Sequence, residues 1–245
     1  MKKVLSIVLC AGLFMLVSSF TSMKTIESPV YKVKRLKGPM TIDANWNKSQ
    51  WKKVKEVSVD NYMGDIPAFK PTVKAKMMYD DKNLYVIFKV DDNHVRITVD
   101  KFQGPVSTDA CVELFFAPDS AYPLRYFNLE INAGGTAVIA YHVDGVRTNL
   151  TAEDFAPVEI AHVLPKKLDK EIDVPTTWTL EYKLPLEVIR KFSNITEPKK
   201  GVKWKANFYK TASKSTNAHY ITWAVVDNPT PKFHLPQFFG TLEFK

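Results

Sequence analysis

The side chains best suited to chemistry fall in two stretches that lie far apart in the sequence. The run STDACVELFFAP holds two carboxylates, Asp109 and Glu113. The proline-rich run NPTPKFHLPQFF carries Phe233 and His234. Aromatic rings on a stiff backbone lose little conformational entropy on binding, and carboxylates accept hydrogen bonds from hydroxyl groups. This combination indicates contact with flat, weakly polar ligands such as sugars, with both stretches meeting at a common rim.

Each of these side chains also has a structural interpretation. Phe233 and His234 could belong to a loop that simply packs over the open end of the fold. Trp223 precedes an apolar run, which is typical of a core residue, and ligand contact is the alternative. Glu113 alternates with apolar neighbours, so it points either into a cleft or toward a lysine on the outer face. Asp109 is interpreted as a second ligand contact.

The carboxylates do not have the spacing of a hydrolase pair. Asp109 and Glu113 on one strand are separated by about 13 Å at roughly 3.3 Å per residue. Glycoside hydrolysis needs about 5 to 9.5 Å between its two carboxyl groups. A cross-strand pair with Glu130 or Glu181 stays open. The chain has no nucleophile elbow, P-loop or dinucleotide fingerprint, so the sequence favours a protein without catalytic residues.

Metal and haem sites have only weak support in the sequence. The five histidines are scattered and none has the spacing of a zinc site. The acidic turns 80–81 and 91–92 offer oxygen ligands for a structural calcium ion, although ordinary turn capping is favoured. No other cofactor is indicated. An alternative haem or redox module needs an axial pair, for which Met77 or Met78 with a histidine are the candidates, and no pattern places a histidine opposite them.

The elements that must position these residues are mainly strands. Apolar and polar residues alternate over 72–79, 178–184 and 203–208, whereas 84–88 and 112–116 are more uniformly apolar, as in central strands covered on both faces. Helical signals are confined to 45–54 and 185–192. The pattern predicts an all-β fold: a single antiparallel β-sandwich of about ten strands with one or two short helices.

The first residues predict a targeting segment. A basic start and an apolar run over 4–17 are followed by small polar residues, so residues 1–22 are interpreted as a signal peptide and 23–245 as one domain. Cys10 lies inside the apolar run rather than after it, which disfavours a lipoprotein. We therefore expect an exported protein, in the periplasm, secreted or at the cell surface. No second apolar stretch is long enough to span a membrane.

The charge and cysteine content limit the classes of partner that the protein can have. The net charge is +8, yet the lysines are spread along the chain without an arginine-rich stripe or a nucleic-acid motif, which argues against a nucleic-acid partner. Cys111 is the one cysteine of the expected mature chain, so it cannot form an internal disulfide and is interpreted as a buried packing residue.

Seven segments in order resemble the family 9 carbohydrate-binding modules and the wider group of DOMON-related sandwich proteins. The resemblance covers nearly all of the expected mature chain, and the ordered set carries it rather than any single motif. The segments are TIDANWNKSQW (41–51), YDDKNLYVIFKVDD (79–92), STDACVELFFAP (107–118), RYFNLEINAGG (125–135), WTLEYKLPLE (178–187), WKANFYK (204–210) and ITWAVVDNPTPKFHLPQFFGTLEF (221–244).

The resemblance implies a non-catalytic β-sandwich that binds oligo- or polysaccharides between two aromatic rings, often with structural calcium. One ring of this clamp falls on Phe233. The other falls near Val106, where no ring is present and Phe102 is the closest candidate. Glu113 matches a sugar-binding glutamate, and a family arginine is replaced by Glu130. The resemblance also implies a role in polysaccharide catabolism beside glycan-degrading enzymes; the departures at Val106 and Glu130 favour the alternative of a cell-surface interaction protein that has lost the sugar site.

Overall fold

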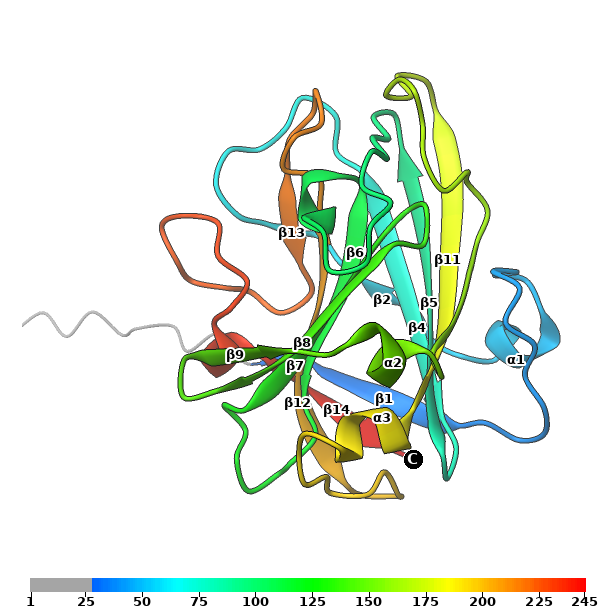
Figure 1. Ribbon diagram of the computed structural model, residues 1–245, viewed down its shortest axis with the longest axis vertical. Helices are drawn as coiled ribbons and strands as arrows, with labels where there is room; N and C mark the ends of the chain where they lie inside the picture. The colour runs from blue at the N-terminus through cyan, green and yellow to red at the C-terminus, as the bar shows by residue number, and fades with distance from the viewer. Residues whose placement is uncertain (1–27) are drawn as a thin grey trace, which may run out of the picture.

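The computed structural model describes residues 28–245, which form one curled, mixed β-sheet folded into two layers (Figure 1). The predicted signal peptide, and the first residues of the predicted domain up to 27, lie outside the described residues. The strands are β1 (Val30–Arg35), β2 (Val57–Ser58), β3 (Asn61–Tyr62), β4 (Thr72–Tyr79), β5 (Asn83–Asp92), β6 (Cys111–Ala117), β7 (Tyr126–Asn132), β8 (Ala137–Val143), β9 (Val146–Asn149), β10 (Glu159–His162), β11 (Thr176–Pro185), β12 (Lys203–Thr211), β13 (Tyr220–Thr222) and β14 (Gly240–Phe244).

Helices are few and short, as the sequence predicts. They are α1 (Ser49–Lys52), α2 (Ala152–Phe155), α3 (Leu186–Arg190) and the 3-10 turns η1 (Val106–Thr108) and η2 (Pro236–Phe238). The predicted helical regions 45–54 and 185–192 contain α1 and α3, whereas α2 was not predicted. Within residues 28–245, no helix is long and apolar enough to cross a membrane.

The sheet order corrects the prediction of about ten antiparallel strands. The described residues form fourteen strands, in the main order β10-β11-β5-β4-β1-β14-β12-β6-β7-β8-β9. Strand β1 pairs in parallel with β14 through Val30–Val33 and with β4 through Lys34 and Arg35, because it passes from one layer to the other. The other paired strands are antiparallel. Strands of two to four residues are too short to show an alternation in the sequence.

The core between the layers follows the predicted alternation. The inward residues of β4, β11 and β12 are buried, including Trp178 and Trp204. Strand β6 is buried along its whole length, which confirms a central strand covered on both faces. Burying one such large side chain contributes roughly 1.5–3 kcal/mol, so these strands define the fold. Cys111 is fully buried, as its interpretation as a packing residue requires.

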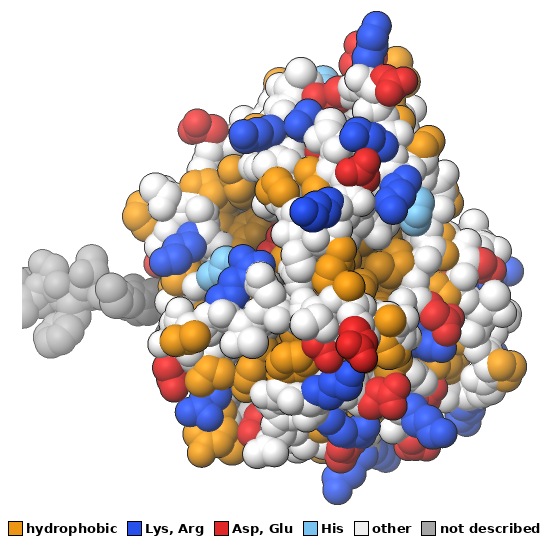
Figure 2. Space-filling model, viewed as in Figure 1, with side chains coloured by type: hydrophobic (Ala, Val, Ile, Leu, Met, Phe, Trp, Pro, Cys, Tyr) orange, Lys and Arg blue, Asp and Glu red, His pale blue; other side chains and the backbone are white. Residues whose placement is uncertain are grey.

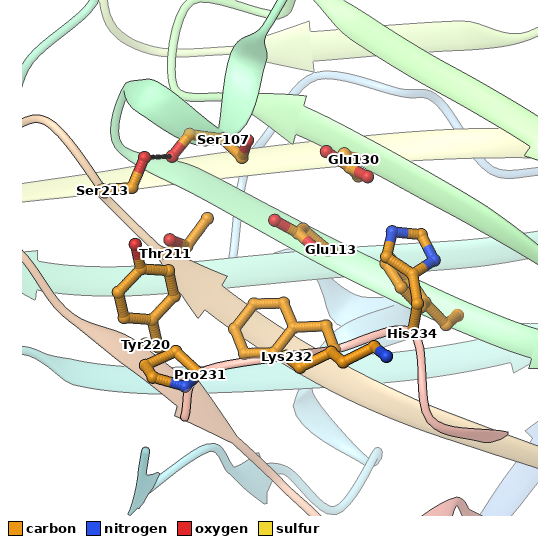
Figure 3. A pocket seen from close by; sticks show the side chains of 11 residues that line it. Ser107, Glu113, Glu130, Thr211, Ser213, Tyr220, Pro231, Lys232 and His234 are labelled. Atoms are coloured by element: carbon orange, nitrogen blue, oxygen red, sulfur yellow. Dashed lines mark hydrogen bonds between the residues drawn. The ribbon is translucent and has the colours of Figure 1, made fainter. Parts of the chain in front are cut away.

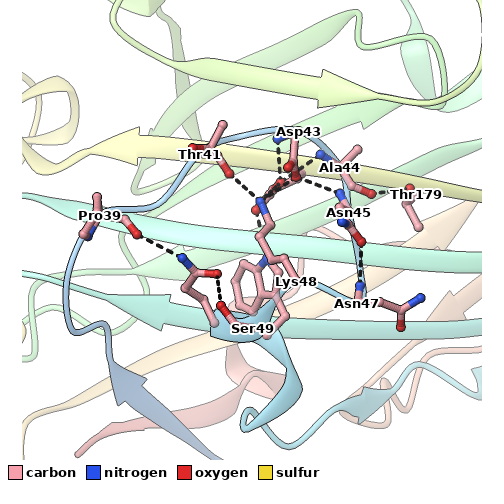
Figure 4. A network of polar contacts seen from close by, with 12 residues as sticks. Pro39, Thr41, Asp43, Ala44, Asn45, Asn47, Lys48, Ser49 and Thr179 are labelled. Carbon is pink, nitrogen blue, oxygen red and sulfur yellow. Dashed lines mark hydrogen bonds and ion pairs between the residues drawn. The ribbon is translucent and has the colours of Figure 1, made fainter.

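The outward face of β11 is not solvated, because the segment that contains α1 covers it (Figure 4). Glu181 is fully buried there. Its carboxylate accepts hydrogen bonds from the backbone N–H groups of Asp43 and Ala44, from Lys48 Nζ and from Trp51 Nε1, at 2.7–2.9 Å. The carboxylate therefore anchors the start of the domain and is not available as a hydrolase partner.

Candidate functional site

The outer face of one layer carries a second apolar cluster. Strands β6, β7 and β12 lie side by side, and their alternate residues point away from the interlayer core. Residues 223–239, called the covering loop below, fold over this face. Phe233 of the loop stacks on Tyr209 with 4.2 Å between ring centroids, and Phe115 packs edge-on against the same tyrosine at 4.9 Å. The hydroxyl of Tyr209 donates to the carbonyl of Phe233 at 3.1 Å, which fixes the loop to the sheet.

A cavity of about 320 Å³ remains between the covering loop and the sheet (Figure 3). Its aromatic lining comes from Phe115, Tyr220, Phe233 and His234. In Figure 2 this face of the molecule is hollowed, with hydrophobic side chains around the hollow and basic and histidine side chains at its edge. The cavity therefore combines apolar walls with an opening to solvent.

Two carboxylates, Glu113 and Glu130, form one wall of the cavity (Figure 3). They lie opposite each other in the register of β6 and β7. Glu113 is 2% exposed, and its Oε1 atom has no hydrogen-bond partner among the described residues. Glu130 accepts a hydrogen bond from Asn128 Nδ2 at 2.8 Å.

The two carboxyl groups retain protons more strongly than isolated ones. Burial raises the pKa of Glu113 well above its usual value, and the neighbouring charge of Glu130 raises it further. Burial also raises the pKa of Glu130, although the hydrogen bond from Asn128 opposes this shift. Glu113 is buried and Glu130 is half-buried beside it, so ionisation of one carboxyl group disfavours ionisation of the other.

The histidines at the rim are neutral at neutral pH. Nδ1 of His234 shares a hydrogen bond of 2.9 Å with the hydroxyl of Tyr126, whose ring stacks on His142 with centroids 4.7 Å apart. Partial desolvation lowers the pKa of His142 to about 4, with a smaller contribution from Arg147. The ring of His234 packs against Phe115 and His142 but keeps an exposed side, and partial desolvation with nearby positive charges lowers its pKa to about 4. Both rings therefore act as apolar or hydrogen-bonding surfaces rather than as cations.

The structure brings together three of the residues singled out in the sequence. Glu113, Phe233 and His234 line the same cavity, which confirms that the stretches near positions 110 and 233 meet. The cavity lies on the outer face of a layer, however, and not at the loop edge of the sandwich. Phe233 is only 8% exposed because one of its faces packs on Tyr209, so a small part of the ring is available to a ligand.

Asp109, predicted as a second ligand contact, lies away from the cavity. Its carboxylate is fully buried and does not line the cavity. It accepts hydrogen bonds of 2.8 Å from the backbone N–H groups of Thr98 and Val99 and one of 3.0 Å from Asn132 Nδ2. Arg96 lies 3.4 Å away. Since its oxygens are already occupied, Asp109 holds the segment before η1 against the sheet.

The two further aromatic candidates also lie elsewhere. Phe102 stacks on Phe155 with ring centroids 5.1 Å apart, at the edge of the interlayer core. Trp223 packs edge-on against Phe208 at 5.7 Å and lines a separate surface hollow. Val106, at the position of the second clamp ring, is fully buried. The expected two-ring clamp is therefore not formed by these residues.

Several lining residues were not singled out in the sequence. Phe115 follows Glu113 by two positions, so strand alternation alone indicates that both face the same way. Thr211 and Tyr220 line the cavity from β12 and β13. No sequence signal identifies them, because their position depends on strand register and on the path of the covering loop.

The acidic turns are occupied by ordinary capping contacts. Asp80 Oδ1 accepts hydrogen bonds of 2.7 Å from the backbone N–H groups of Lys82 and Asn83, and Asp92 Oδ1 accepts one from His94. In residues 28–245, no three His, Cys, Asp or Glu side chains gather in a way that could hold a metal ion.

The methionines considered for a haem ligand are core residues. Met77 is fully buried in the interlayer core, and Met78 packs in the cluster around Trp51. His219 bonds to Lys210 and His234 to Tyr126. In residues 28–245 these contacts do not pair a histidine with either methionine.

The family model and the similar solved structures all relate to carbohydrate-binding proteins. The family model for carbohydrate-binding family 9 matches residues 39–244. A candidate carbohydrate-binding protein from Bacteroides uniformis ATCC 8492 has a TM-score of 0.80 and 25% identity, over 89% of this chain and 100% of that chain. A family 9 carbohydrate-binding module from Caldicellulosiruptor kristjanssonii in complex with cellotriose has a TM-score of 0.61 and 17% identity, over 89% and 94%. Its glucose complex gives 0.61 and 16%, over 89% and 96%. Comparison with curated proteins gave no match.

Proposed function

Because the chain belongs to carbohydrate-binding family 9, a family of non-catalytic binding modules, we propose that its outer-face cavity binds a saccharide without cleaving it. The observation that carries this proposal is the cavity in which aromatic rings and two carboxylates converge. Apolar sugar faces pack on rings, and sugar hydroxyls bond to carboxylates. Glu113 and Glu130 would fix the hydroxyls, while Tyr220, Phe233 and His234 would contact the ring of the sugar.

The size of the cavity favours a short saccharide or a chain end. About 320 Å³ lies at the lower end of the range for small-molecule sites. The relatives from Caldicellulosiruptor kristjanssonii were solved with glucose and cellotriose, so these two sugars are the first ligands to test. Binding would be modest, because Phe233 offers only part of one ring.

The arrangement of the paired carboxylates supports a binding site rather than a hydrolase site. Glycoside hydrolysis uses two carboxyl groups that flank the scissile bond from different sides. Glu113 and Glu130 instead lie next to each other on one wall. Burial raises the pKa of both carboxyl groups. Their environments therefore do not divide them into one general acid and one general base.

The setting of the function is part of the same proposal. A basic start and an apolar run at the N-terminus support export, to the periplasm, the medium or the cell surface. Polysaccharide catabolism beside glycan-degrading enzymes would be the natural setting for an exported saccharide-binding protein.

Titration of the protein with glucose and cellotriose by isothermal calorimetry tests the function. We expect dissociation constants in the micromolar to millimolar range. Phe233→Leu keeps an apolar side chain but removes the ring, so it should weaken binding about threefold to tenfold. Tyr122→Leu is the matched control, because Tyr122 is an exposed ring outside the cavity. A folded protein that binds no saccharide on a glycan array would favour the interaction-protein alternative.

A further inference from the structure

The wall formed by Glu113 and Glu130 has more negative charge than a neutral sugar requires. The two residues are opposite each other on adjacent strands, where Cβ atoms lie about 4.5–5.5 Å apart. Neither carboxylate forms an ion pair with a lysine or arginine in the described part of the chain. Like charges in a buried site are unfavourable unless a cation or a proton joins them.

An unsatisfied oxygen points to what is missing. Oε1 of Glu113 is buried and accepts no hydrogen bond, although the residue lines an open cavity. Buried polar atoms in folded proteins are nearly always paired, so an unpaired oxygen that faces a cavity is available to a ligand donor. The donor that such a carboxylate binds most strongly is a positively charged N–H group.

The other charged groups around the pair do not supply this cation. Lys210 of β12 is buried and bonds to His219 Nε2 at 2.6 Å and to the carbonyl of Thr211. Arg147 of β9 donates to Asn149. Lys232 of the covering loop lines the cavity and is exposed, and among residues 28–245 it forms no ion pair with either carboxylate (Figure 3). His234 is neutral at neutral pH, because partial desolvation and nearby positive charges lower its pKa to about 4. Lys210 and Arg147 therefore offset part of the negative charge from a distance, and no cation of residues 28–245 forms an ion pair with Glu113 or Glu130.

We propose that the cavity binds an amino sugar, with the ammonium group of the sugar held between the carboxylates of Glu113 and Glu130. This inference rests on the proposed saccharide-binding function and specifies its ligand class. An ammonium group has three N–H donors, enough to reach Glu113 Oε1 and the carboxylate of Glu130 together. The ammonium group supplies the positive charge that the two carboxylates lack.

The rest of the cavity suits the same ligand. The rings of Tyr220 and Phe233 line it, and aromatic faces attract cations as well as the apolar face of a sugar. An N-acetylated sugar has no positive charge, so it gains nothing from the carboxylate pair. A divalent metal is a poorer occupant, because no third His, Cys, Asp or Glu side chain joins the pair in residues 28–245.

Calorimetric titration of the full protein at pH 7 with glucosamine, glucose and N-acetylglucosamine tests the proposal. We expect glucosamine to bind at least about tenfold more tightly than the two neutral sugars. Glu113→Gln and Glu130→Gln each should remove this preference for glucosamine over glucose, because the neutral amide has no charge to hold the ammonium group. Glu187→Gln, an exposed glutamate on α3 outside the cavity, is the matched control and should change nothing.

The possible outcomes distinguish amino-sugar binding from saccharide binding in general. If glucose binds and glucosamine binds no more tightly, the amino-sugar assignment is overturned and saccharide binding stands. If no sugar binds, both are overturned. A preference for glucosamine that survives both glutamine substitutions, or equal affinity for ethanolamine, also overturns it. The comparison of the three sugars on the unmodified protein needs no variant, so a substitution that fails to fold does not leave the question open.

Discussion

At the scale of single residues, Glu113 carries most of the functional argument. Its alternation with apolar neighbours allowed either a cleft or an outer-face lysine, and the structure decides for the cleft. Burial without a partner for Oε1 destabilises the charged form, so the free protein is less stable than it could be at this position. Functional sites commonly show this kind of conflict with stability.

Substitution of Glu113 by glutamine should stabilise the protein at high pH. The folded pKa is raised above the unfolded value, so the contribution of this group is fully present below the unfolded pKa, near 4.3, and is lost as the pH rises through the folded pKa. Glu113→Gln does not titrate. We expect its free energy of unfolding to exceed that of the original protein by roughly 1–3 kcal/mol at pH 8 and by less at pH 5.

Guanidinium denaturation at the two pH values measures this difference. Glu187→Gln should show the same small difference at both, because Glu187 is exposed. An equal effect of Glu113→Gln at pH 5 and pH 8 would contradict the raised pKa.

At the scale of elements, the covering loop makes the site. Without residues 223–239 the outer face of β6, β7 and β12 would be an exposed apolar surface. Asn207 fixes the start of the loop through hydrogen bonds with the carbonyl and N–H of Ala224, at 3.1 and 2.8 Å. Gly64 supports its middle, since a Cβ atom there would lie 2.8 Å from Cγ of Pro231. A turn in the first third of the chain therefore sets the position of a cavity residue.

Replacing Gly64 by alanine should weaken saccharide binding without touching the ligand. The new methyl group would displace Pro231, which lines the cavity, so we expect affinity to fall about threefold to tenfold. Gly38→Ala is the matched control. Both glycines have positive φ, 69° and 82°, so both substitutions introduce backbone strain, but the site of Gly38 is open.

Calorimetry with the best-binding sugar compares the two variants. Equal affinities would mean that the covering loop adjusts freely and does not depend on this contact.

At the scale of the whole molecule, two layers are joined by a shared strand and by one buried polar link. Lys210 of β12 lies 3.7 Å from Asp92 of β5, and neither side chain is exposed. Burial lowers the pKa of Lys210, while the charge of Asp92 raises it. Removing one partner of such a pair leaves an isolated buried charge, which is more costly than removing both.

Lys210→Met should therefore lower the free energy of unfolding by about 3–5 kcal/mol. Asp92→Asn keeps an acceptor for the N–H of His94 but removes the charge. The double variant should be more stable than the sum of the two single effects predicts, by about 0.5–3 kcal/mol. Chemical denaturation of the original protein, the two single variants and the double variant measures this difference. Additive effects would show that the two charges do not interact across the layers.

Much of the fold and part of the site could be predicted from the sequence. Alternation over β4, β11 and β12 identifies the residues that face the core, since side chains in a strand point to opposite faces in turn. It does not say whether the opposite face is solvated. The outward residues Glu181 and Asn207 are both buried, because other segments of the chain fold over them.

The sequence by itself determined the β class of this protein, its core strands and the stretches that carry Glu113 and Phe233, because these follow from the local order of apolar and polar residues. Only the tertiary structure decided that Glu113 lies opposite Glu130 and that Asp109 accepts hydrogen bonds from the backbone. It also decided that the covering loop closes an outer face of the sandwich rather than its edge. These features depend on strand register and on contacts between distant residues, which local patterns do not specify.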